Sequence, residues 1–443
     1  MKPARLLIAA VLLAGLSAVV YFSNKSEAAK EGKPAADAAP KILSLDEKNI
    51  TQFEIKKRDG TDTVAKKDDS GKWSLVTPAL PADQNACNAV TSAVTSLTAD
   101  RLVDDNATDL ASYGLAPAAD TVTFTTKDGK KTTLLVGDGT PTGNNVYAKI
   151  DGDSKLYTMA SFNKDSLDKD SRQLRDKRLM TFDQDKISRV ELNDKKGAIE
   201  FGRVNQNEWQ ILKPKPLRAD GFQVEELVRK VKNGEMDTNV SDEDAKKLAA
   251  SWGSAAPVAT VKVTDASGTQ SIEIRKAKDD YLAKSSVVDG VHKITKDMGE
   301  GVDKSLDDFR NKKLFDFGFA DPSKVEVKDG GKTVSFEKSG ENWMAGGKKM
   351  DSTSIQALID KLRDLAATKF VETGFTAPAL ELTVVSNEGK RTEHVQIAAN
   401  GIAKREGDTS LYQLDPNVLN DIRSAAGDVK EAQASQTPSS QKK

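Results

Sequence analysis

Few side chains in this sequence have the chemistry of a nucleophile, a general base or a metal ligand. The chain contains two histidines, His292 and His394, and one cysteine, Cys87, and neither histidine has a His or Cys neighbour at the spacing of metal ligands. Zinc sites and histidine-based triads need several such groups brought together. We interpret the histidines as sheet-surface residues and Cys87 as a small core residue. We therefore predict no catalytic, cofactor-binding or metal-binding residues.

Two kinds of loop-like stretch resemble ligand loops only in composition. Val136–Gly143 (VGDGTPTG) lacks the Gly-Lys-Ser/Thr that opens a helix in a phosphate-binding loop, and its glycines join two strand patterns. The acidic stretches Asp104–Asn106 and Asp151–Asp153 lack the glycine and glutamate spacing of a calcium-binding loop. We predict turns at all three places. Acidic residues are so numerous that a catalytic carboxylate pair cannot be recognised, and a hydrolase stays open as a less favoured function.

The charge balance argues against nucleic acid as a partner. Lys and Arg together number 66 and Asp and Glu 67, and the two signs are interspersed along the chain. A nucleic-acid-binding protein normally shows a basic patch or stripe. The single cysteine also excludes an internal disulfide framework.

The N-terminus carries the one long apolar run. Residues 6–22 (LLIAAVLLAGLSAVVYF) contain no charge, and Lys2 and Arg5 precede them. At about 1.5 Å per residue the run is near the lower limit for crossing a hydrocarbon core of roughly 30 Å. We predict an uncleaved transmembrane signal anchor in the inner membrane, with the bulk of the chain periplasmic. A cleaved secretory signal ending near Ser26–Ala28 is the alternative.

The elements that follow repeat three times. Trp73, Trp209 and Trp343 recur at spacings of 136 and 134 residues, each after a short alternating strand and before a helical pattern. Each helix starts after an aspartate that can cap it. Further markers of the repeat are the capping residues Asp83, Asp220 and Asp351, and the glycines Gly114, Gly253 and Gly374 ahead of the next strand pair. Because the tryptophans recur at a structural joint, we favour core packing over a ligand platform for them.

The fold class predicted from these patterns is α+β, with three tandem repeats of mainly antiparallel sheet plus amphipathic helices after one N-terminal transmembrane helix. The predicted boundaries are a signal anchor over 1–22, a flexible linker over 23–42, repeats over 43–182, 183–317 and a shortened 318–424, and a disordered tail over 425–443.

The first two repeats end on similar basic segments. Leu174–Leu179 (LRDKRL) matches Phe309–Leu314 (FRNKKL) at an offset of 135 residues. One interpretation is an exposed hinge whose Leu179 and Leu314 pack into the next repeat. The other is a surface for a protein partner or lipid headgroups, formed by Arg175, Asp176, Lys177, Arg178, Arg310, Lys312 and Lys313.

The order of elements in the first repeat resembles a known family. After Trp73 and the capped helix come Tyr113–Pro117 (YGLAP), Val136–Gly139 (VGDG), Val146–Ala148 (VYA) and Leu174–Lys177 (LRDK). This order is similar to the bacterial domain-of-unknown-function 4340 family, DUF4340. The resemblance is close in the first repeat, weaker in the second and faint in the third.

The resemblance implies one N-terminal membrane segment and a partner among ABC-exporter components of the gliding-motility type. It supplies no catalytic residues. We therefore expect a membrane-anchored, extracytoplasmic, non-enzymatic accessory or scaffold protein, attached through residues 6–22 and associated with an ABC-type transport or cell-envelope complex. An envelope module that binds glycan or peptide is the alternative.

Overall fold

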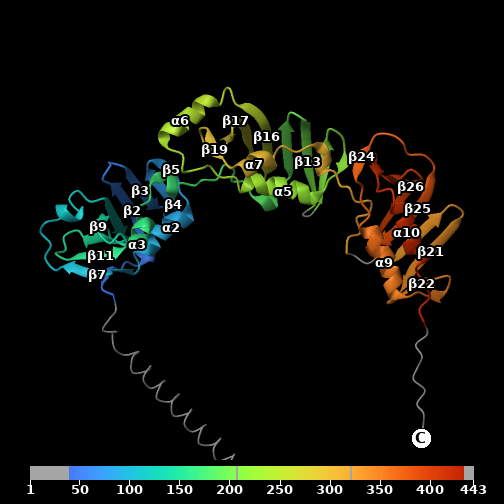
Figure 1. The fold of residues 1–443 in the computed structure, drawn as a ribbon, viewed down its shortest axis with the longest axis horizontal. Coiled ribbons are helices and arrows are strands. Elements are labelled where there is room, and N and C mark those ends of the chain that lie inside the picture. Colours follow the sequence, from blue (N-terminus) through green and yellow to red (C-terminus); the bar gives the residue numbers. More distant parts are fainter. Residues whose placement is uncertain (1–38, 206–207, 320–321, 434–443) are drawn as a thin grey trace, which may run out of the picture. The chain divides into compact units, whose positions relative to one another are not determined.

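The computed structural model describes residues 39–205, 208–319 and 322–433 (Figure 1). Strands account for 43% of the described residues and helices for 21%, and these strands form four sheets. Every pairing between these strands is antiparallel in the described part of the chain. Mainly antiparallel sheet is therefore the dominant architecture.

The predicted α+β class with a leading transmembrane helix is wrong. Sheet outweighs helix, because hairpins with two-residue alternation fill most of each repeat. The longest helices of the described residues, Gly221–Lys232 and Ser352–Arg363, have 12 residues each, and no described helix is long and apolar enough to cross a membrane. The apolar run at 6–22, on which that helix was predicted, lies outside the described residues.

The first repeat forms one large sheet and a small one. The large sheet has the order β5-β4-β3-β2-β8-β9-β10-β11-β7, and β1 pairs with β6 separately. The strands are β1 (Lys41–Leu43), β2 (Ile50–Lys57), β3 (Asp62–Lys67), β4 (Trp73–Thr77), β5 (Ala79–Pro81), β6 (Leu97–Thr98), β7 (Arg101–Asp104), β8 (Asp120–Thr126), β9 (Lys131–Gly139), β10 (Asn145–Ile150) and β11 (Leu156–Ala160). The helices are α2 (Gln84–Ala93), α3 (Ser161–Leu167) and α4 (Ser171–Leu174), with short 3-10 turns at Glu47–Asn49 and Ala111–Tyr113.

The second repeat has an eight-stranded sheet in the matching order β15-β14-β13-β12-β16-β17-β18-β19. Its strands are β12 (Arg189–Asp194), β13 (Gly197–Asn205), β14 (Glu208–Lys213), β15 (Leu217–Arg218), β16 (Ala256–Asp265), β17 (Gly268–Ala277), β18 (Asp280–Ser285) and β19 (His292–Ile294). Its helices are α5 (Gly221–Lys232), α6 (Asp242–Ser251), α7 (Lys296–Gly301) and α8 (Leu306–Phe309), after a 3-10 turn at Gln184–Lys186.

The third repeat returns to nine strands, in the order β23-β22-β21-β20-β25-β26-β27-β28-β24. Its strands are β20 (Lys324–Asp329), β21 (Lys332–Ser339), β22 (Asn342–Ala345), β23 (Lys348–Lys349), β24 (Lys369–Val371), β25 (Pro378–Ser386), β26 (Arg391–Ala398), β27 (Ile402–Arg405) and β28 (Leu411–Gln413). Its helices are α9 (Ser352–Arg363) and α10 (Val418–Gly427). Helix α10 and the bridge between Met350 and Glu431 carry this repeat past 424, into residues that we had assigned to a disordered tail.

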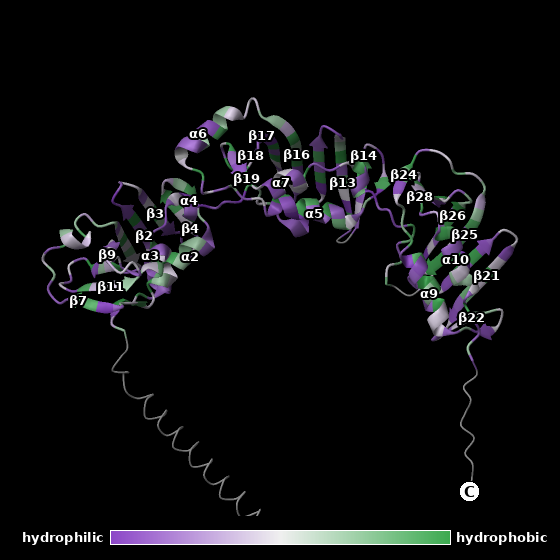
Figure 2. Ribbon diagram, viewed as in Figure 1, coloured by the Kyte–Doolittle hydropathy of each residue, from purple (hydrophilic) through white to green (hydrophobic). Residues whose placement is uncertain are grey.

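The central pairing has the same register in all three sheets. Phe53 lies opposite Phe124, Val190 opposite Val263, and Val325 opposite Val384. All six side chains are fully buried. Helices α2, α5 and α9 place apolar residues in the same core as the sheet and polar residues on their other side, as their mixed colouring in Figure 2 shows.

The described residues form three separate hydrophobic cores. Each of the first two cores ends, and the next begins, within one of the basic segments that join the repeats. The first core includes Leu174, and the second begins with Leu179. The second core ends with Phe309, and the third begins with Leu314. The described residues divide into two compact units between Lys177 and Arg178, so that the second and third repeats share one unit.

The tryptophans at equivalent places belong to these cores. Trp73, Trp209 and Trp343 are 2%, 4% and 8% exposed. The indole N–H of Trp73 donates to Asn88 Oδ1 at 2.8 Å, and that of Trp209 to Glu225 Oε1 at 2.7 Å. Both acceptors lie five residues after the capping aspartate of the following helix. The three tryptophans are therefore core residues of their repeats.

Candidate functional site

The chain enters every repeat through the same short motif. Ile42–Leu45 (ILSL), Leu179–Phe182 (LMTF) and Leu314–Phe317 (LFDF) stand at the start of the three repeats, and we call them the entry segments. Their apolar side chains join the core of the repeat that follows. The residue before each entry segment is bridged to the chain just beyond the first long helix, in the pairs Lys41 with Thr98, Arg178 with Glu235, and Lys313 with Ala366.

The chain also leaves every repeat through one set of backbone bonds. The backbone N–H of each capping aspartate donates to the departing chain, from Asp83 to Leu174 O at 2.8 Å, from Asp220 to Phe309 O at 2.7 Å and from Asp351 to Lys430 O at 2.8 Å. A second bond returns two residues later, from Asp176 to Pro81 O at 2.8 Å, from Asn311 to Arg218 O at 3.0 Å and from Ala432 to Lys349 O at 2.9 Å. We call these pairs of bonds the exit clamps.

The entry segment therefore fixes the start of each repeat and the exit clamp fixes its end. Only a few residues separate an exit clamp from the next entry segment. The segment at Lys430–Ala432 takes the place in the third repeat that the basic joints take in the first two. Leu179 and Leu314 pack into the following core, as the hinge interpretation expected.

The basic residues of the two joints differ in exposure. Arg178, Lys312 and Lys313 are exposed. Arg175, Asp176 and Lys177 are partly buried, and burial lowers the pKa of Arg175.

Arg310 is largely withdrawn from the predicted partner surface. Its guanidinium lies 3.4 Å from the ring centre of Phe370 and bonds Asp307 at 3.0 Å and Ser410 Oγ at 3.0 Å. It therefore packs between the second and third repeats.

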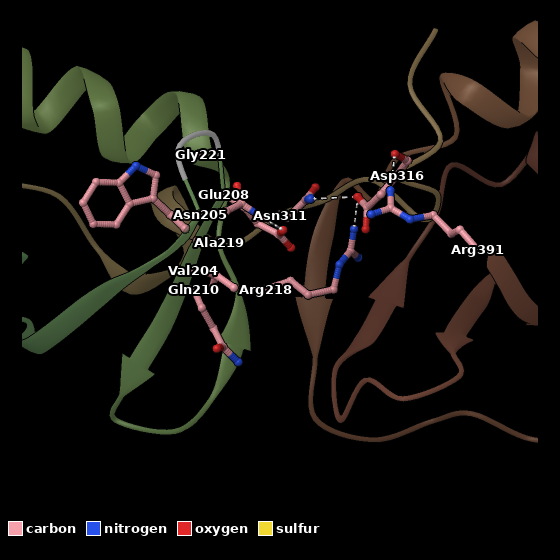
Figure 3. Close-up of a pocket in the computed structure, with 11 residues that line it drawn as sticks. Val204, Asn205, Glu208, Gln210, Arg218, Ala219, Gly221, Asn311, Asp316 and Arg391 are labelled. Atoms are coloured by element: carbon pink, nitrogen blue, oxygen red, sulfur yellow. Dashed lines mark hydrogen bonds and ion pairs between the residues drawn. The ribbon is translucent and has the colours of Figure 1, made fainter. Parts of the chain in front are cut away.

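The second joint holds an ionic network that the sequence interpretation missed (Figure 3). Arg218 on β15 donates to Asp316 Oδ1 at 2.5 Å, to the backbone O of Lys313 at 2.8 Å and to the Tyr412 hydroxyl at 3.1 Å. Arg405 holds the other carboxylate oxygen of Asp316 at 2.7 Å and Glu393 at 2.8 Å. Asp316 is the one charged residue in the three entry segments. A charged side chain in an otherwise apolar motif needs an ion-pair partner, and this was the signal in the sequence that could have indicated the network.

The network stabilises the ionised forms of Asp316 and Arg218. Burial acts to raise the pKa of Asp316, but Arg218 and Arg405 outweigh it and hold that pKa below its usual value. Burial acts to lower the pKa of Arg218, but Asp316 and Tyr412 outweigh it and the pKa rises. Burial, together with the hydrogen bond to Asp408, raises the pKa of Tyr412 to about 12.

A pocket of about 520 Å³ opens beside this network. Its lining includes Val204, Trp209 and Gln210 from the second repeat. The third repeat adds Asp316 and Arg391 to the lining. Figure 3 shows Arg218 and Asn311 directed at Asp316, with Arg391 beside it. Arg391 donates to the backbone O of Asp316 at 2.8 Å and is otherwise exposed.

The motifs that carried the family resemblance assemble in one place in the first repeat. Arg58 donates to the backbone O of Gly114 at 2.7 Å and to Asp138 at 2.9 Å. The Tyr113 and Tyr147 rings meet edge to face at 4.9 Å. Gly114 has φ of +64°, and a Cβ there would lie 2.2 Å from the Asp138 carboxyl carbon. These residues pack the turn before β8 against β9, which is a structural role.

The remaining candidates behave as ordinary parts of sheets and turns. His394 lies on β26, with Nδ1 at 3.1 Å from Thr383 Oγ1 and Nε2 at 3.4 Å from Glu381. His292 Nε2 lies 2.9 Å from the backbone O of Asp289. Cys87 is fully buried, and burial raises the pKa of its thiol to about 12. Within the described ranges no group of three or more His, Cys, Asp or Glu side chains has metal-binding geometry.

The predicted turns also take a definite form. Asp104 and Asp153 accept from backbone N–H groups two residues ahead, at 2.9 Å and 3.2 Å. Val136–Gly139 is the end of β9, where the pairing with β10 shifts register, and the turn itself spans Thr140 to Gly143. The glycines thus serve a bulge and a hairpin.

Comparison with known proteins places these repeats in a family. The model of a domain of unknown function, DUF4340, matches residues 73–214 and again 209–383. Each match starts at a repeat's tryptophan, Trp73 or Trp209. Neither a curated protein nor a solved structure matches the chain. Because the two matches together span well over half of its length, the chain belongs to the DUF4340 family.

Proposed function

We propose that this protein is a non-enzymatic scaffold of the bacterial cell envelope, attached to the inner membrane through residues 6–22 with its repeats on the periplasmic side. Its partner is a subunit of an ABC-type transport or envelope complex. The attachment is supported by the uncharged run LLIAAVLLAGLSAVVYF behind Lys2 and Arg5. The partner class is supported only by the family resemblance.

One observation carries the scaffold proposal: the same entry segments and exit clamps recur in three successive repeats. A chain secured to the sheet at both ends of each repeat resists local unravelling, because pulling on a terminus loads backbone hydrogen bonds and a buried core together. Such construction suits a protein that holds partners at set positions.

Cell fractionation followed by affinity purification tests this proposal. The full chain should be recovered with the membranes and, after detergent extraction, with subunits of one transport or envelope complex. A matched chain lacking residues 6–22 should leave the membrane fraction. Recovery of the full chain as a soluble protein would contradict the attachment, and a detergent extract without such subunits would contradict the partner.

The envelope binding module is the second candidate, and the pocket of about 520 Å³ at the second joint favours it. Its accessible polar groups include Arg391 and Gln210. Titration of the full chain with cell-wall glycan fragments or short peptides tests this candidate. Saturable binding that Arg391→Ala abolishes would favour the binding module over the scaffold.

A further inference from the structure

The two joints share a backbone design but differ at two decisive side chains. The exit clamp places Pro81 in the first joint where Arg218 stands in the second. The entry segment places Thr181 where Asp316 stands. Thr181 bonds instead to Gln270 of its own repeat, through its N–H at 2.8 Å and its hydroxyl at 3.1 Å. An arginine–aspartate pair at these positions exists only at the second joint.

We propose that Arg218 is a lock that fastens the third repeat to the second, so that the two repeats move as one rigid body. This inference does not rest on the proposed function. Arg218 reaches out of β15 and donates side-chain hydrogen bonds to the backbone O of Lys313 in the joint, and to Asp316 and Tyr412 of the third repeat. Its side chain is only 21% exposed.

The charges explain why the locked state is favoured. The third repeat contributes three carboxylates to the network, Asp316, Glu393 and Asp408. Its Arg405 pairs with two of them, whereas its Arg391 bonds only the backbone O of Asp316. Arg218 is the second cation, 2.5 Å from Asp316 and 3.9 Å from Asp408. If the repeats separated, Arg405 would be the one third-repeat cation still paired with these carboxylates, and like charges in a low-dielectric setting repel strongly.

The fork of the guanidinium matters as much as its charge. One nitrogen serves the carboxylate of Asp316, while the other serves Lys313 O and the Tyr412 hydroxyl. A planar guanidinium can hold these directions at once, which a single ammonium cannot. The Arg310 guanidinium on the Phe370 ring and the clamp from Asn311 to Arg218 O lie beside it and support the same geometry.

The lock also shapes the pocket. Its lining comes from β13, β14, β15 and the start of α5 in the second repeat, from Asn311 in the joint, and from Asp316 and Arg391 in the third repeat. Because neither repeat supplies all the walls, the pocket exists only while the joint is closed.

Distance measurement between two spin labels on the full chain tests the lock. One label is placed at Lys246→Cys on α6 and the other at Lys332→Cys on β21, both at exposed lysines. The native Cys87 does not compete for label, since it is fully buried and its thiol pKa is raised to about 12. The doubly labelled protein should give a single narrow distance distribution.

The decisive variant is Arg218→Gln, and the matched control is Arg423→Gln. Arg423 also loses a two-bond pairing, to Asp329 at 2.8 and 3.0 Å, but that pair lies within the third repeat. We expect Arg218→Gln to lose the narrow peak and Arg423→Gln to keep it. A narrow peak unchanged in folded Arg218→Gln would overturn the proposal, as would the same broadening in the control.

A second variant covers the case in which Arg218→Gln does not fold, as judged by circular dichroism. Arg218→Lys keeps the charge and loses the fork, and we expect it to fold with a broadened distribution. A distribution identical to that of the unmodified chain would then overturn the lock.

Discussion

At the scale of single residues, the sequence identified the buried tryptophans but missed the ionic network. The threefold recurrence of Trp73, Trp209 and Trp343 was a sufficient signal for core packing, because a ligand platform has no reason to recur at a structural joint. Arg218 and Arg405 gave no such signal, since Arg and Lys are common throughout the chain. Their role depends on a contact between residues about 100 to 190 positions apart, which only the fold reveals.

Gly114 and Gly253 occupy matching places in the first two repeats and should respond differently to alanine. Gly114→Ala should destabilise the first repeat by about 1 to 2 kcal/mol, the usual cost of a left-handed residue with a side chain. The φ of Gly114 is +64°, and the new Cβ would displace Asp138 from Arg58. The free energy of unfolding, measured in urea, checks this.

Gly253→Ala is the control for that measurement, because a Cβ there meets nothing within 4 Å and its φ is not in the left-handed region. The change should leave stability within about 0.5 kcal/mol. Equal losses at the two glycines would show that the turn geometry, as described, is not what Gly114 provides.

At the scale of elements, the helix caps were predictable and the joints were not. Asp83, Asp220 and Asp351 accept from first-turn N–H groups, as the sequence predicted. The same residues donate their own backbone N–H groups in the exit clamps, and no sequence pattern indicates this second role. Isolated two-residue bridges carry no periodicity, so pattern analysis cannot find them.

The capping role can be measured helix by helix. Asp220→Ala should cost about 1 kcal/mol, within the range for loss of a cap. Its carboxylate accepts from Phe222 N at 3.0 Å and Gln223 N at 3.3 Å. Chemical denaturation of the full chain, followed by circular dichroism, provides the measurement.

The matched control is Asn417→Ala at the start of α10, where the N-cap side chain makes no capping bond. We expect almost no change there. A loss at Asn417 as large as that at Asp220 would contradict the assignment of the stabilisation to the cap.

At the scale of the whole molecule, the sequence predicted that the chain contains three repeats and where the joints between them lie. It did not predict that the second and third repeats contact each other. The three large sheets share the order of their first eight strands, and one core ends and the next begins within each of the two basic segments. From the sequence, the two joints were nevertheless predicted to be equivalent, because their basic segments are similar. The structure groups the second and third repeats into one unit, in agreement with the Arg218 network at that joint.

The coupling should depend on pH with a definite sign. The folded pKa of Asp316 is held below its unfolded value of about 3.9, so its ion pairs stabilise the protein above that value and the contribution is lost as pH falls through the folded pKa. Asp316→Asn should therefore be less stable than the unmodified chain by a constant amount from about pH 5 to 8. That difference should shrink as the pH is lowered further, which thermal unfolding at a series of pH values will show.

A difference that instead grew below about pH 4 would mean that the folded pKa of Asp316 is raised, against the geometry of Arg218 and Arg405. Glu381→Gln is a suitable control, because its carboxylate pairs with Lys328 within the third sheet and away from the joint.

Site-specific photo-crosslinking in intact cells tests the scaffold account most directly. A photoreactive residue placed at Lys312 or Lys313, both exposed at the second joint, should form an adduct with a subunit of one membrane complex. The same residue at Lys332, exposed in the hairpin between β20 and β21, should form none. Absence of any adduct at the joint, or the same adducts from all three positions, would contradict the account.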